Sequence, residues 1–91
     1  MTDFVDEVAR GREAAHLLEH PLLVAAFVEI RKDLMRTWAA APVRDTEGRE
    51  NIWMMTKLLE RVEAALRQHI ITGKMAANQL EAIKARGESN I

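Results

Sequence analysis

Residues 22–83 carry two apolar stripes on either side of a polar turn, and read LLVAAFVEIRKDLMRTWAAAPVRDTEGRENIWMMTKLLERVEAALRQHIITGKMAANQLEAI. Before the turn, large apolar side chains recur every three or four residues, a spacing that a helix places on one side. This segment is therefore predicted to be an amphipathic helix. Its stripe is Leu23, Phe27, Ile30, Leu34 and Trp38, flanked by Val24, Val28 and Met35.

The segment after the turn has a longer stripe with a heptad rhythm. Its positions are Ile52, Met55, Leu59, Val62, Leu66, His69, Gly73, Ala76, Leu80 and Ile83. This rhythm lets one helix lie along another at a shallow angle. Glycine often ends a helix, but the rhythm stays in phase through Gly73, and an interior glycine costs only about 1 kcal/mol. We therefore expect one long helix from about Thr46 to Arg86.

The helix boundaries follow from the residues at the turn and near the start of the chain. Asp45 and Thr46 are both good N-caps for the helix that follows the turn. Pro42 disfavours helical geometry in the preceding residue, so the helix before the turn should end at about Ala40. A first helical segment is expected from about residue 3 to residue 19, with the stripe Phe4, Val8, Gly11, Ala15 and Leu18. His20 and Pro21 should break or kink the chain, because proline removes a backbone hydrogen bond and crowds the turn before it.

Folding the chain about the turn sets the two stripes opposite each other. The expected pairs are Trp38 with Ile52, Leu34 with Met55, Ile30 with Leu59, Phe27 with Val62 and Leu23 with Leu66. Before the kink, with a shift of one residue, they are Leu18 with Gly73, Ala15 with Ala76, Gly11 with Leu80 and Val8 with Ile83.

The expected fold is all-α, with residues 1–91 forming a single helical domain. It is a long antiparallel helical hairpin kinked near Pro21, which dimerises into a four-helix bundle. Arm one covers about residues 3–40, the turn covers residues 41–45, and arm two covers about residues 46–86. Residues 87–91 form a frayed tail. The alternative is a compact three- or four-helix bundle with breaks at Pro21 and Gly73.

Composition excludes several classes of protein. The chain is 48% apolar and 30% charged, with few glycines and prolines, which favours a folded all-α protein. Its 13 basic and 14 acidic residues nearly balance, which argues against a protein built to hold nucleic acid. It has no cysteine, and no run approaches the ~20 apolar residues of a membrane span. We expect no disulfide and no membrane insertion.

The three histidines are the only metal-site candidates in the sequence. His16 and His20 lie one helical turn apart, and the expected register brings His69 opposite His20. Imidazoles with a nearby carboxylate suit zinc. However, His-x-x-x-His recurs by chance, and Pro21 distorts the backbone beneath His20. We favour solvated or structurally hydrogen-bonded histidines, with no metal and no other cofactor.

The turn carries the candidate partner-binding site. Trp38 and Trp53 stand on either side of it, and Arg44 and Arg49 lie between them in the sequence. Tryptophan and arginine are enriched at the energetic centres of protein interfaces, and they can also grip phosphate or stacked bases. The alternative interpretation is that the tryptophans plug the end of the hairpin while the charges pair among themselves.

The acidic residues do not indicate an enzyme. Acid–base catalysis needs carboxylates in a desolvated pocket. Most acidic residues here instead lie beside basic residues at helical spacing, which is typical of a solvated helix face. Examples are Glu63 with Arg67, Glu29 with Lys32, and Glu81 with Lys84. The Gly73-Lys74 pair lacks the rest of a phosphate-binding loop. No catalytic residues are expected.

Additional apolar rows predict self-association. One partner arm cannot cover them, and a second copy packing antiparallel would complete a four-helix bundle, so a dimer is expected. The rows comprise Val24, Val28, Met35, Met54, Leu58 and Ala65.

The segments WAAAPVRDTEGRENIW (residues 38–53) and ITGKMA (residues 71–76) resemble short uncharacterised helical proteins of tailed bacteriophages and prophages. The resemblance covers roughly residues 14–83. It implies a phage origin and a place among virion-assembly genes, and it supplies no catalytic residues. The expected location is then the cytoplasm of a bacterial host or the virion.

Two classes of function follow. The favoured one is a non-enzymatic homo-oligomeric helical protein acting through protein–protein contacts in phage assembly or virion structure, with a phage or host protein as partner. The alternative is a small regulatory module that binds a host protein or nucleic acid. Its basic strip would be Arg31, Lys32, Arg36, Arg44 and Arg49, but the acids Asp33, Asp45, Glu47 and Glu50 interleave with that strip and disfavour nucleic acid.

Overall fold

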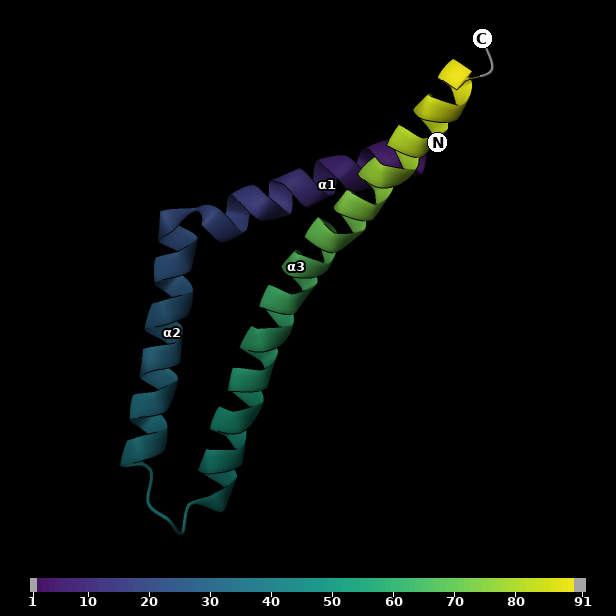
Figure 1. Cartoon of the computed structure of the whole chain (residues 1–91). Coiled ribbons are helices and arrows are strands. Elements are labelled where there is room, and N and C mark those ends of the chain that lie inside the picture. The colour runs from purple at the N-terminus through teal and green to yellow at the C-terminus, as the bar shows by residue number, and fades with distance from the viewer. Residues whose placement is uncertain (1, 90–91) are drawn as a thin grey trace. The chain divides into compact units, whose positions relative to one another are not determined.

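The computed structural model describes the backbone of residues 2–89 and the side chains of residues 3–87. These residues form three α-helices and no strand: α1 (Thr2–Glu19), α2 (Pro21–Ala40) and α3 (Thr46–Ser89) (Figure 1). The prediction of an all-α chain is confirmed. α3 is helical across Gly73 and continues past the expected end at Arg86, so the break at Gly73 that the compact alternative required does not occur. Residues 90 and 91 of the expected tail lie outside the described part.

The chain leaves helical geometry at His20, which separates α1 from α2. His20 has an extended backbone, with φ −65° and ψ 122°, and its Nδ1 accepts a hydrogen bond from the N–H of Leu22 at 3.2 Å. Pro21 is the first residue of α2, a position where a missing backbone N–H removes no helical hydrogen bond. The expected break at Pro21 is confirmed, and His20 serves as the N-cap.

Local hydrogen bonds end α2 and start α3 where the sequence predicts. The N–H of Ala41 donates to the carbonyl oxygens of Thr37 and Trp38, at 3.0 and 3.2 Å. After the turn, Oδ1 of Asp45 accepts from the N–H of Gly48 at 2.9 Å. Asp45 is therefore the N-cap of α3, because it satisfies one of the N–H groups left open at the start of a helix.

The helices form two compact units. One, the α1 unit, comprises Met1–Leu18 and Ala65–Ile91, so that α1 packs with the later part of α3. The other, the α2 unit, comprises Glu19–Ala64, so that α2 packs with the earlier part of α3. In the α2 unit the two helical segments run antiparallel, and in the α1 unit α1 crosses the later part of α3 at an angle (Figure 1).

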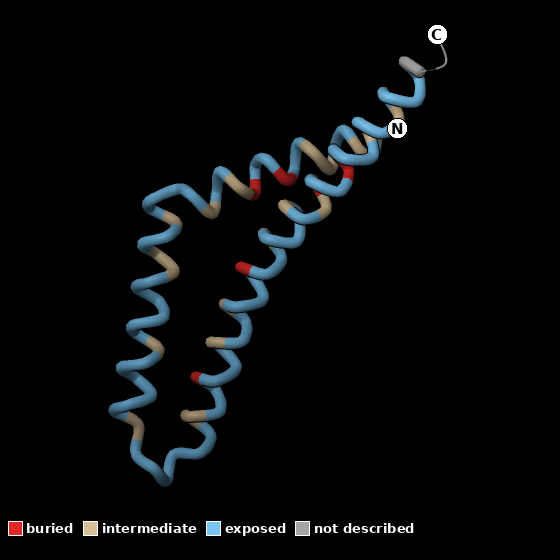
Figure 2. Tube along the Cα trace, in the orientation of Figure 1, coloured by how far each residue is buried: buried red, intermediate tan, exposed pale blue. Residues whose placement is uncertain are grey.

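The α1 unit is centred on a contact between two glycines. A Cβ built on Gly11 would lie 2.8 Å from the carbonyl oxygen of His69 and 3.1 Å from the Cα of Gly73. A Cβ on Gly73 would lie 2.9 Å from the carbonyl oxygen of Glu7. Both glycines are buried, and so are the nearby Ala14 and Ala76 (Figure 2). The two backbones touch here because no side chain separates them.

The register predicted for this unit is wrong. Gly73 faces Gly11, not Leu18, and Gly11 does not face Leu80. In both cases the error is seven residues along one helix, which is one heptad. A shift of one heptad presents the same stripe to the partner helix. The close approach that glycines allow selects the observed register.

The α2 unit has a thin interior and broad apolar surfaces. Among its residues, only Ile52 and Glu63 are buried (Figure 2). Three of the expected pairs are consistent with the structure, because Trp38 and Ile52 line one groove, and the pairs Leu34–Met55 and Ile30–Leu59 line another. Several seam and flanking side chains nevertheless stay exposed: Val24, Val28, Ile30, Met35, Met54, Met55, Leu58 and Val62.

Candidate partner-binding site

Trp38 and Arg49 form the centre of the candidate site, near the turn of the α2 unit. Trp38 stands in the last turn of α2, and Arg49 stands in the first turns of α3. The guanidinium carbon of Arg49 lies 4.1 Å from the centroid of the Trp38 ring. An N–H of the same guanidinium donates to the carbonyl oxygen of Ala41 at 3.3 Å. The arginine therefore ties the end of α2 to the start of α3 through stacking and one hydrogen bond.

Trp53 has a weaker cation contact within α3. The ammonium nitrogen of Lys57 lies 5.7 Å from the centroid of its ring and 3.3 Å from a carboxylate oxygen of Glu60. Trp53 is 57% exposed and Trp38 is 40% exposed. Neither tryptophan is a buried plug of the hairpin, so both rings present apolar area to solvent.

The two tryptophans share two grooves. One has a volume of about 470 Å³ and is lined by Trp38, Val43, Thr46, Arg49, Glu50 and Trp53. The other, which we call the tryptophan groove, has a volume of about 380 Å³ and is lined by Leu34, Met35, Trp38, Ala39, Ile52, Trp53 and Thr56. The structure thus brings together three of the four residues predicted for the site.

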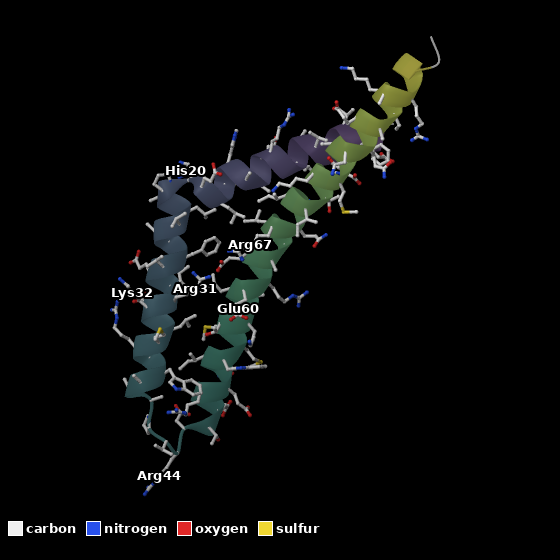
Figure 3. The ribbon with its side chains drawn as sticks, in the orientation of Figure 1. His20, Arg31, Lys32, Arg44, Glu60 and Arg67 are labelled. Carbon is white, nitrogen blue, oxygen red and sulfur yellow. The ribbon has the colours of Figure 1, made fainter. Side chains whose placement is uncertain are left out.

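Arg44 is the fourth predicted residue, and it lies apart from the other three. It is exposed at the tip of the turn, points away from both helices (Figure 3), and lines neither of these grooves. Val43 beside it is also strongly exposed and lines the first groove. Arg44 stays a predicted contact residue because its side chain is exposed.

Sequence reasoning missed an ion pair between α2 and α3. Arg31 on α2 pairs with Glu63 on α3, and the Glu63 side chain is 8% exposed whereas that of Arg31 is 44% exposed. Glu63 was expected on a solvated face with Arg67, and that expectation is wrong about its burial. Glu63 lies four residues after Leu59 and three before Leu66, both of them seam residues, and this helical spacing is the signal that would have placed it near the partner helix.

The basic strip of the regulatory alternative does not form a continuous surface in the α2 unit. Arg31 points toward α3 and Lys32 points away from it (Figure 3), because consecutive residues turn by about 100° on a helix. Arg36 pairs with Asp33 within α2 at 3.4 Å, and Arg49 is stacked on Trp38. These cations therefore point in different directions.

The histidines are all exposed, and His20 has the structural role of capping α2. Within the described residues, no three side chains of His, Asp or Glu are arranged to hold a metal ion.

Along residues 2–89, no helix combines the length and apolar character that crossing a membrane requires. Compared with protein-family models, with curated proteins and with solved structures, the chain has no match.

Proposed function

We propose that this chain is a non-enzymatic, homo-oligomeric helical protein that acts through protein–protein contacts. The resemblance to phage proteins suggests a role in phage assembly or virion structure, in the cytoplasm of a bacterial host or in the virion. In this proposal the partner, a phage or host protein, is captured near the turn by Trp38, Arg49 and Trp53, with Arg44 as an outer contact.

The exposed apolar surface of the α2 unit carries the proposal. Met35, Trp38 and Trp53 line one groove together, and each is at least 40% exposed. Isolated exposed apolar side chains are ordinary, but a gathered set of them marks an interaction surface. Two exposed tryptophans with stacked cations fit the composition of interface centres.

Sedimentation equilibrium over a wide range of protein concentrations tests self-association. We expect the weight-average mass to rise above the monomer mass of 10.3 kDa as concentration increases. A chain that remains monomeric at every concentration would remove the homo-oligomer from the proposal.

The rival class, a regulatory module for nucleic acid, makes a different prediction. Binding through phosphate contacts weakens steeply with salt, and the dispersed cations and near-zero net charge favour weak contacts. We expect no DNA or RNA binding tighter than about micromolar at physiological salt. Tight, salt-sensitive binding that the Arg44→Ala, Arg49→Ala double variant abolishes would favour the rival instead.

A further inference from the structure

The α2 unit has a second apolar groove, which contains no tryptophan and no charged residue. We call it the aliphatic face, and its volume is about 290 Å³. Every residue that lines it is aliphatic: Ile30, Leu34, Met55, Leu58, Leu59 and Val62. Leu34 and Leu59 are half-buried, while the other four are exposed.

The aliphatic face and the tryptophan groove lie on opposite sides of the α2 unit. Trp53 and Val62 are nine residues apart on α3, which at about 100° per residue places them on opposite sides of the helix. Ile30 and Met35 are five residues apart on α2, so their directions differ by about 140°. One partner molecule therefore cannot cover both surfaces through a single flat contact.

We infer that the aliphatic face binds a second copy of this chain, and that the tryptophan groove stays open in the resulting dimer. The inference rests on the proposed function, and it specifies which surface self-associates. In a two-fold dimer, each copy presents the same face, so the face must be complementary to itself. A uniformly aliphatic surface meets that condition, because it brings no like charges together.

The two surfaces differ in the charged side chains that lie around them. The centres of protein interfaces are depleted of charged residues. Around the tryptophan groove, Arg49 and Lys57 stand over the tryptophan rings, and Lys57 also pairs with Glu60. Burying that surface against an identical copy would bring these like cations together. Neither groove has a charged lining residue, but the aliphatic face includes no aromatic ring over which a cation could stand.

The whole side of the α2 unit that carries the aliphatic face offers somewhat less area than a standard dimer interface. α2 has 20 residues, so the side-by-side pair of α2 and the earlier part of α3 measures about 30 Å by about 20 Å. That footprint of about 600 Å² approaches the roughly 800 Å² per partner of a standard stable interface. The thin interior of the unit, with only Ile52 and Glu63 buried, also needs additional packing.

Single cysteines test the inference, since the chain has none of its own. Leu58→Cys and Val62→Cys place a thiol on the aliphatic face, and Met35→Cys places one in the tryptophan groove at comparable exposure. Under mild oxidation, at least one of the first two variants should form disulfide-linked dimers about tenfold faster than Met35→Cys, because association raises the local thiol concentration. Faster cross-linking of Met35→Cys would overturn the inference.

Charge insertion gives an independent measurement on the same protein. Leu58 is 61% exposed and Met35 is 72% exposed, so glutamate is tolerated similarly at both positions within one copy. Leu58→Glu should weaken self-association by at least about tenfold, since it would bury charge in the dimer, whereas Met35→Glu should leave it nearly unchanged. Circular dichroism checks that both variants stay helical, and the cysteine variants decide the question if Leu58→Glu unfolds.

The outcomes distinguish this inference from the proposed function. If the native chain is monomeric at every concentration, the proposed homo-oligomer fails and the inference fails with it. If the native chain associates and Met35→Glu, but not Leu58→Glu, dissociates it, the proposed function stands and the inference is wrong.

Discussion

Gly11 of α1 and Gly73 of α3 meet backbone to backbone, so closely that a Cβ on Gly11 would lie 3.1 Å from the Cα of Gly73. Small residues let two helices approach in this way, because their side chains do not hold the helix axes apart. The contact sets the register of the α1 unit, and it leads to the first prediction.

Gly11→Ala and Gly73→Ala should each destabilise the protein by about 1–3 kcal/mol, because the added methyl group meets backbone atoms that cannot move aside. The reference is Gly87→Ala, where a Cβ meets nothing within 4 Å. That variant should be neutral, or stabilising by up to about 1 kcal/mol, since alanine is the better helix former. Urea unfolding at one fixed protein concentration compares the three. Equal stabilisation by all three variants would contradict the close contact.

The Arg31–Glu63 pair should couple more strongly than an ordinary surface ion pair. A double-mutant cycle with Arg31→Ala and Glu63→Ala should give a coupling of about 1–2 kcal/mol, because Glu63 is buried while Arg31 keeps partial contact with water. The Lys57–Glu60 pair is exposed on both sides and should give about 0.5 kcal/mol or less. Similar coupling in both cycles would show that burial of Glu63 adds nothing to its pairing.

Asp45 should stabilise the start of α3 through its side-chain oxygen. Asp45→Ala should cost about 1 kcal/mol, whereas Asp45→Asn retains an oxygen acceptor and should cost less. Hydrogen exchange of the Gly48 amide reports directly on the cap, and should accelerate in Asp45→Ala alone. Unchanged exchange at Gly48 in Asp45→Ala would mean that another group caps the helix.

Replacing Arg49 should alter the surroundings of Trp38 and the stability of the protein, whereas replacing Arg44 should alter neither, although both arginines belong to the predicted site. In a Trp53→Phe background, Trp38 is the sole tryptophan and its fluorescence reports on its surroundings. Arg49→Ala should change that emission and destabilise the protein by about 0.5–1 kcal/mol through loss of the stacking contact. Arg44→Ala should change neither, because Arg44 is exposed at the tip of the turn. An emission change caused by Arg44→Ala, and not by Arg49→Ala, would reverse the two roles.

The sequence by itself determined the three helices and their boundaries at His20 and at the turn. Pro21, Pro42 and Asp45 act on backbone within one helical turn of themselves, so the break at His20, the end of α2 and the start of α3 were predictable. The unbroken heptad rhythm through Gly73 likewise predicted the continuity of α3. Near the turn, the short connection leaves α2 and α3 little freedom to slide, and the predicted pairs there agree with the grooves that they line.

Only the tertiary structure decided the register of α1 on α3 and the burial of Glu63. A heptad stripe looks the same after a shift of seven residues, so the pattern cannot distinguish Gly11 opposite Gly73 from Gly11 opposite Leu80. The contact is decided by how closely two backbones approach, which depends on both glycines at once. Arg31 and Glu63 are likewise 32 residues apart, and each looks like a solvated helix residue until the two helices meet. Local preferences act over one turn of helix, whereas register and burial depend on which surfaces of two distant segments come into contact.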